Sequence, residues 1–221
     1  MSKQNRVQPD GRIIATDARG TFMGNRGGTL HNDNQELVRQ ARTKGWIICV
    51  LEFKNRQRKI MTPGEYTELF FLDEATALAA GHRPCHECRR ERALAFRAAM
   101  VTDNPLFPEG AKTKFPMLDD VLQRERMTEA YFINDRRKRT YLTGVGALPN
   151  GVFIFYNQDF YLIWGNKIYG WTPTGYLTPA ARPVDEDVVV LTPLSTVAAL
   201  RSGYVPDVHV SAGLANSVPH S

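Results

Sequence analysis

The segment 81–90 (GHRPCHECRR) constrains the fold of this 221-residue chain more than any other part of the sequence. It contains Cys85 and Cys88, and it lies between an alanine-rich stretch and a basic stretch. A Cys-x-x-Cys turn that leads into a helix aims both sulfurs at one point, and the positive helix N-terminus favours their thiolate forms. Such a turn supplies half of a tetrahedral zinc site. The sequence therefore predicts bound zinc, provided that other parts of the chain supply the remaining ligands.

The remaining ligands must come from one further cysteine and the histidines. Cys49 lies in an apolar run, where it is either a third ligand or a small buried hydrophobic residue. His31 lies in a glycine-rich loop that can reach a neighbouring element. His82 would crowd three ligands into seven residues, and His86 is expected to point away from a metal held by the two cysteines beside it. Cys49 and His31 are therefore the candidate additional ligands.

The composition indicates a globular chain that stays in the cytoplasm. Hydrophobic residues make up 43% and charged residues 23% of the sequence. No apolar run approaches the ~20 residues that a membrane-spanning helix needs, and the first residues lack the apolar core of a secretion signal. Three cysteines, an odd number with one close pair, do not form a disulfide framework. We therefore expect no membrane partner, and a metal or free thiols at the cysteines.

The charge is concentrated in one part of the chain. Residues 1–145 carry 25 Lys and Arg against 18 Asp and Glu, whereas residues 146–221 carry 3 against 5. A basic surface next to the cysteines suits a polyanion, and nucleic acid is the first candidate. The alternative is an ordinary solvated surface, because an isoelectric point near 9.2 is common among globular proteins.

A resemblance to a known family covers residues 69–90 (LFFLDEATALAAGHRPCHECRR). This stretch resembles the second half of the metal-binding domain of the Ada family of alkyl-phosphotriester repair proteins, with its apolar strand, its EA..AGFRPC..C helix and turn, and its basic helix. The resemblance implies zinc held by cysteines and a basic surface that contacts DNA. The family's upstream cysteine pair, which contains the methyl acceptor, has no counterpart here beyond Cys49, so self-methylation is not implied. The leading hypothesis is a DNA-associated protein, in DNA repair or its regulation.

Basic residues after the turn and near residue 138 are the candidates for phosphate contacts, which would position DNA without reading its sequence. The alternative is a solvated helix face with Glu87 and Glu91 as ion-pair partners. The candidate nucleic-acid-binding residues are Arg26, Arg89, Arg90, Arg92, Arg137 and Lys138.

The glycine-rich loop 24–33 (GNRGGTLHND) supports a second hypothesis, an enzyme that acts on nucleic acid or nucleotides by metal-assisted or acid–base chemistry. Asn25 and Arg26 can approach a phosphate in such a loop. His31 and Asp33 are the candidate catalytic base and its orienting carboxylate, although such a run more often forms a turn that caps the next helix.

The pattern of elements predicts an α+β fold. An Ada-like zinc-turn element is expected in the N-terminal part, and a small antiparallel sheet with a flanking helix in the C-terminal part. The aromatic strands of that sheet favour cross-strand packing, with a base-stacking or protein-binding surface as alternatives.

The expected regions are 1–102 (Ada-like, basic, with the zinc turn), 103–145 (linker and charged helix), 146–210 (antiparallel β-rich region) and 211–221 (disordered tail). The predicted helices are 35–43, 74–80, 86–100, 118–127 and 194–200, and the predicted strands are 46–53, 56–61, 66–72, 152–156, 160–164, 167–171 and 188–191.

Overall fold

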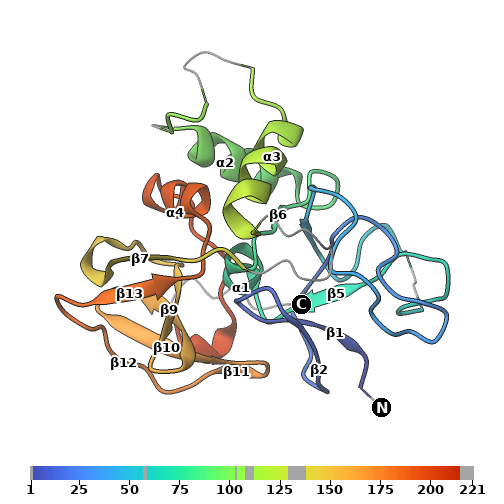
Figure 1. Cartoon of the computed structure of the whole chain (residues 1–221), viewed down its shortest axis with the longest axis horizontal. Coiled ribbons are helices and arrows are strands. Elements are labelled where there is room, and N and C mark those ends of the chain that lie inside the picture. Colours follow the sequence, from blue (N-terminus) through green and yellow to red (C-terminus); the bar gives the residue numbers. More distant parts are fainter. Residues whose placement is uncertain (1, 57–58, 103, 108–111, 129–137, 215–221) are drawn as a thin grey trace.

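The computed structural model describes residues 2–56, 59–102, 104–107, 112–128 and 138–214, and within them it contains two β-sheets and four α-helices (Figure 1). The predicted α+β class is confirmed. The two sheets lie on opposite sides of the molecule, with α1 between them. The helices are α1 (Glu74–Ala79), α2 (Arg90–Val101), α3 (Phe115–Arg126) and α4 (Leu194–Arg201).

The first sheet combines antiparallel and parallel pairs, in the order β2-β1-β5-β3-β4-β6. Its strands are β1 (Gln4–Val7), β2 (Ile13–Ala15), β3 (Phe22–Asn25), β4 (Ile47–Cys49), β5 (Leu69–Phe71) and β6 (Arg83–Pro84). The pairs β1–β5 and β4–β6 are parallel, and the other pairs are antiparallel. The parallel pair at the β6 edge brings the strand that ends at Cys49 next to the segment that precedes the Cys-x-x-Cys turn.

The second sheet is antiparallel in every pair and contains the aromatic meander that the sequence predicts. Its strands are β7 (Tyr141–Gly144), β8 (Phe153–Tyr156), β9 (Asp159–Trp164), β10 (Lys167–Thr172), β11 (Gly175–Tyr176), β12 (Ala180–Ala181) and β13 (Asp187–Val190). Ile154 and Val190 pair across β8 and β13 and belong to the main core, whereas Phe153 and Leu162 belong to a second cluster with residues of α1. Both faces of this sheet are therefore packed.

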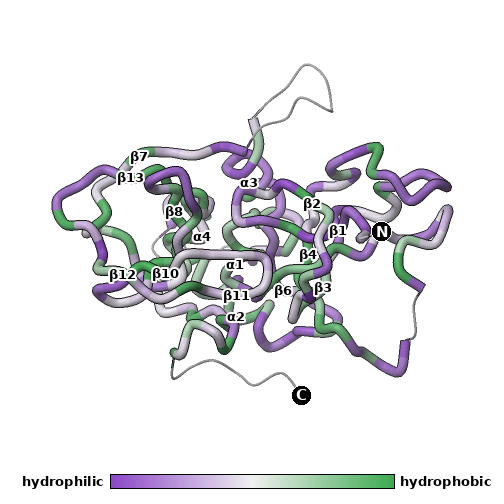
Figure 2. Tube along the Cα trace, turned by 90° about the horizontal axis from the view of Figure 1, so that it is seen from below, coloured by the Kyte–Doolittle hydropathy of each residue, from purple (hydrophilic) through white to green (hydrophobic). Residues whose placement is uncertain are grey.

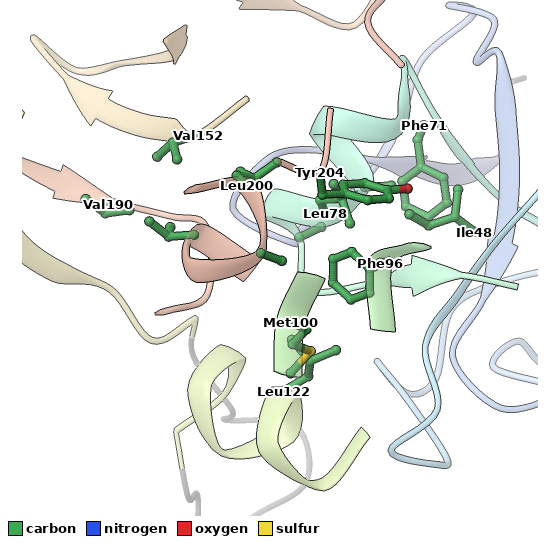
Figure 3. Close-up of a cluster of buried hydrophobic side chains, with 14 of the residues drawn as sticks. Ile48, Phe71, Leu78, Phe96, Met100, Leu122, Val152, Val190, Leu200 and Tyr204 are labelled. Atoms are coloured by element: carbon green, nitrogen blue, oxygen red, sulfur yellow. The ribbon is translucent and has the colours of Figure 1, made fainter. Parts of the chain in front are cut away.

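The main hydrophobic core joins the two parts of the chain. Figure 3 shows Phe96 and Met100 of α2 beside Leu122 of α3, with Tyr204 and Leu200 approaching from the C-terminal part. The rings of Phe96 and Tyr204 meet edge to face, with 5.2 Å between their centroids. Each such buried side chain contributes about 1.5–3 kcal/mol. The long connections that leave the first sheet, at the right of Figure 2, are mostly hydrophilic.

Several predicted elements are confirmed, and the best defined is α1. Asp73 accepts a hydrogen bond from the Thr76 backbone N–H at 2.8 Å, as expected of an N-cap residue. The helix predicted over 86–100 begins only at Arg90, because the Cys-x-x-Cys turn precedes it. The helices predicted at 118–127 and 194–200 correspond to α3 and α4.

The helix predicted over 35–43 is wrong, and the described residues of the strand predicted over 56–61, residues 56 and 59–61, form no strand. Residues 57 and 58 lie outside the described part of the chain. The Asn32 side chain accepts hydrogen bonds from the backbone N–H groups of Asn34 and Glu36, and Gln35 has a φ of 64°, so the chain turns there instead of forming a helix. The apolar run 46–53 forms strand only at β4. The tail is ordered as far as residue 214, since the Ser211 hydroxyl accepts a hydrogen bond from the Tyr176 backbone N–H. Residues 215–221 lie outside the described part of the chain.

A buried carboxylate ties α1, α2 and the C-terminal segment together. Glu74 is fully buried, and its oxygens accept hydrogen bonds from Arg89 at 3.0 Å, Arg92 at 2.5 Å and the Tyr204 hydroxyl at 2.6 Å. Arg89 also contacts Asp207 at 2.8 Å. Burial by itself raises the pKa of Glu74, but the charges of Arg89 and Arg92 outweigh it, so the pKa lies below its ordinary value.

We expect Glu74→Gln to lower the free energy of unfolding by about 3 kcal/mol, because breaking a buried ion pair leaves charges without their partner. Urea denaturation at pH 7 measures this loss. The exposed Glu91→Gln variant is the matched control, with a change within about 0.5 kcal/mol. The wild-type stabilisation is present above the ordinary carboxyl pKa of 4.5 and is lost as the pH falls through the lower folded value. Equal stabilities of the two variants would contradict this role.

Candidate metal centre

The register of the short parallel pair β4–β6 positions the first two cysteines. Ile47 lies opposite Arg83, and the Cys85 backbone N–H donates to the Ile48 carbonyl at 2.9 Å. Neighbouring strands lie ~4.8 Å apart. One step further along both strands, this register brings Cys49 and Cys85 side by side.

The third cysteine comes from the turn that follows β6. The Glu87 backbone N–H points at the Cys85 sulfur at 3.4 Å, and the Arg89 N–H donates to the Cys85 carbonyl at 3.0 Å. The turn therefore folds back on itself, and α2 begins directly after it. Cys88 is half-buried, whereas Cys49 and Cys85 are buried.

The three sulfurs form one compact group. The Sγ atoms of Cys49, Cys85 and Cys88 lie within 4.8 Å of one another, and among the described residues they form the one group of three or more potential metal ligands. Sulfurs bound to one tetrahedral zinc ion through bonds of ~2.3 Å would lie about 3.8 Å apart. The donor set and its spacing therefore fit a zinc ion. The position of Cys49 beside the other two sulfurs is the clearest gain over the sequence, which also allowed a role in hydrophobic packing.

The proximity of the sulfurs perturbs their ionisation. Hydrogen bonds from Cys49 and then Cys88 lower the pKa of the Cys85 thiol. The corresponding bonds to Cys85 and Cys88, together with burial, raise the pKa of Cys49. The pKa of Cys85 is thus the one of the three that is lowered. Metal ions bind the thiolate form of cysteine, so metal binding at such a group releases protons.

A pocket of about 400 Å³ opens in front of the three sulfurs. Sequence reasoning missed its other walls, because they come from the connection after β4 and from the segment around β5. The lining residues are Met23, Ile47, Cys49, Val50, Leu51, Glu52, Phe53, Arg56, Ile60, Tyr66, Glu68, Phe70, Cys85, Glu87 and Cys88. The one sequence signal for this region is the basic run that begins at Lys54.

The three histidines weighed as zinc ligands in the sequence lie outside this group. Both ring nitrogens of His31 are engaged, with the Thr67 hydroxyl at 2.6 Å and the Thr62 carbonyl at 3.0 Å. His82 is fully buried, and its Nε2 accepts a hydrogen bond from Arg26. The ring of His86 packs on a phenylalanine of α3. The structure therefore does not bring His31 to the cysteines.

The loop 24–33 does not form the base and carboxylate arrangement that a catalytic pair requires. His31 is buried, Asp33 is exposed, and neither hydrogen bond of the imidazole goes to Asp33. The Asn25 side chain accepts hydrogen bonds from the backbone N–H groups of Gly27 and Gly28, both at 2.6 Å. These contacts hold the turn itself, so the turn alternative holds here without the helix that it was expected to cap.

The candidate phosphate-binding residues fall into two groups. Arg26 is 1% exposed, stacks 4.0 Å from the Trp46 ring centroid and donates to a backbone carbonyl. Lys138 donates to the Ala79 carbonyl at 2.6 Å, and burial, followed by the nearby charge of Arg126, lowers its pKa to about 7. Arg26 and Lys138 are thus engaged in internal contacts.

The candidate arginines of α2 and of the turn before it differ in whether they pair with internal carboxylates or face solvent. Arg89 and Arg92 neutralise the buried Glu74 and the nearby Asp207. Arg90 is exposed. Arg137 lies outside the described residues. Of these candidates, Arg90 is the one that the structure places in solvent beside the cysteine group, in a shallow groove that Cys88 also lines.

Within the described residues, each helix is too short or too polar to cross a membrane. Comparisons with protein-family models, with curated proteins and with solved structures give no match to this chain.

Replacing Cys49 by alanine distinguishes a metal ligand from a small hydrophobic residue. If Cys49 is a ligand, Cys49→Ala should weaken zinc binding by at least about tenfold, since even the partners of metal ligands contribute that much. Competition with a chromophoric chelator measures the affinity. The variant would instead show Cys49 to be a packing residue if it bound zinc as tightly as the wild type. Its loss of stability would then be the same with and without metal.

Proposed function

We propose that the protein binds one zinc ion through Cys49, Cys85 and Cys88. The observation that carries this proposal is the approach of three sulfurs from two separate segments to within 4.8 Å of one another. Thiolate ligands favour Zn²⁺, Cu(I) or iron–sulfur clusters over hard cations. Zinc suits a redox-neutral, tetrahedral site of this kind. The ion would cross-link β4 to the turn before α2, and so fix the edge of the first sheet against the helix.

We further propose that the surface around this centre associates with DNA, in DNA repair or its regulation. The excess of basic residues in 1–145 and the Ada-like segment 69–90 support this role. Phosphate contacts are best assigned to exposed cations near the pocket, because Arg89 and Arg92 already serve internal carboxylates. Arg90, Lys54 and Lys59 meet this condition.

Each of these three cations lines a groove next to the cysteine group or adjoins a wall residue of the pocket. Arg90 lines a groove together with Cys88. Lys54 shares a second groove with Arg56, which also lines the pocket in front of the sulfurs. Lys59 precedes Ile60, another wall residue. A phosphate backbone that follows these cations would therefore pass over the mouth of the pocket.

We expect Arg90→Ala and Lys54→Ala each to weaken binding of a duplex oligonucleotide at low salt. The slope of log K against log salt should fall in magnitude by about 1 for each variant, because one phosphate contact is lost. Fluorescence anisotropy at several salt concentrations measures both quantities. Lys167→Ala, an exposed lysine in the less basic part, is the matched control and should match the wild type. Unchanged slopes in Arg90→Ala and Lys54→Ala would remove the assigned contacts.

A further inference from the structure

The pocket at the metal centre has the size and form of a small-molecule site. All three cysteines line it, and its volume of about 400 Å³ falls within the ~300–1,000 Å³ of ordinary ligand pockets. Structural zinc sites are closed by four protein ligands, whereas sites with three protein ligands keep one position for an exchangeable ligand. In the described residues, the donor group consists of these cysteines. A zinc ion held here would therefore present its fourth position to the pocket.

The walls favour a flat or apolar ligand. Phe53, Tyr66 and Phe70 contribute aromatic rings, and Met23 and Ile60 add aliphatic surface. Aromatic side chains stack on the planar rings of bases in nucleic-acid complexes. The walls thus suit a heterocyclic ring better than an extended sugar or phosphate group.

The charges of the pocket exclude anions. Glu52, Glu68 and Glu87 line it together with a single cation, Arg56, whose guanidinium pairs with Glu87 at 2.6 Å. Three thiolates on a divalent ion add a further net negative charge. A phosphate or carboxylate would be repelled from the interior. A neutral or cationic ligand that donates N–H hydrogen bonds would be favoured.

Glu68 is the acceptor best placed to select such a ligand. It is 3% exposed, and its Oε2 accepts a hydrogen bond from the Met61 backbone N–H at 2.8 Å. A carboxylate offers about four lone-pair sites on two oxygens. It therefore keeps the capacity to accept from an amino group that enters the pocket.

We propose that the pocket takes one amino-bearing nucleobase, with its ring between the aromatic walls and its amino edge directed to Glu68 and the fourth position of the metal. This inference rests on the proposed zinc site and on the proposed association with nucleic acid. A base extruded from a strand would enter the acidic pocket while its phosphates stay on the basic rim formed by Lys54, Lys59 and Arg90. The acidic interior would thus hold the amino-bearing base, and the basic rim would hold the phosphates of the strand.

The test uses the full chain loaded with Co²⁺, whose visible absorption bands report the ligands of the metal. Adenosine should change the intensity and position of the bands in a saturable titration, and ribose 5-phosphate should leave them unchanged. Glu68→Gln keeps a carbonyl oxygen for the Met61 N–H, so the fold and the cobalt spectrum should persist. Its affinity for adenosine should fall about tenfold, as expected when a charged acceptor is lost. Glu65→Gln, an exposed neighbour, is the control.

The outcomes separate the two proposals. A thiolate–cobalt spectrum that does not respond to adenosine would overturn the nucleobase site and leave the metal site in place. Failure to bind cobalt would overturn both. A single-stranded oligonucleotide with one adenine tests the source of the base, because extrusion into the pocket should shift the cobalt bands as adenosine does. If adenosine shifts the bands and the oligonucleotide does not, the pocket accepts free nucleosides and the extrusion step is wrong.

Discussion

The parallel pairing of β4 with β6 is the constraint on which the candidate site depends. It consists of two residue pairs and of hydrogen bonds from the Arg83 N–H to the Trp46 carbonyl and from the Cys85 N–H to the Ile48 carbonyl. This short register places Cys49 beside Cys85, and the turn then adds Cys88. A register shifted by one residue would turn Cys49 to the other face of the sheet. The metal site, the pocket before it and the proposed ligand position all follow from this one alignment.

Arginine in this chain serves the interior as much as the surface. Arg26 and Arg126 both stack on the Trp46 ring, at 4.0 and 3.9 Å from its centroid, and they donate to backbone carbonyls. Arg89 and its neighbour on α2 neutralise the buried Glu74. The net charge of the sequence therefore overstates the charge that a polyanion can reach. This is why the phosphate contacts are assigned to a few exposed cations at the rim of the pocket.

Local patterns in the sequence predicted the local elements well. The Asp73 cap of α1, the aromatic meander and the paired cysteines of the turn all depend on residues close together in the chain. Contacts between segments far apart in the chain could not be predicted from those patterns. Cys49 joins the turn through strand pairing, and Arg89 meets Glu74 and Asp207, which lie 15 and 118 residues away. The sequence offered these side chains without their partners, so a member of the sulfur group resembled a core residue and an internal ion pair resembled a DNA-binding face.

X-ray absorption at the zinc edge counts the atoms around the metal and so tests whether the three cysteines hold it. We expect three sulfurs at about 2.3 Å and one lighter oxygen or nitrogen ligand at about 2.0 Å. That result would place the ion on Cys49, Cys85 and Cys88 with an exchangeable fourth position. Two sulfurs with two lighter ligands would remove Cys49 from the site, and purified, folded protein without zinc would contradict the metal centre itself.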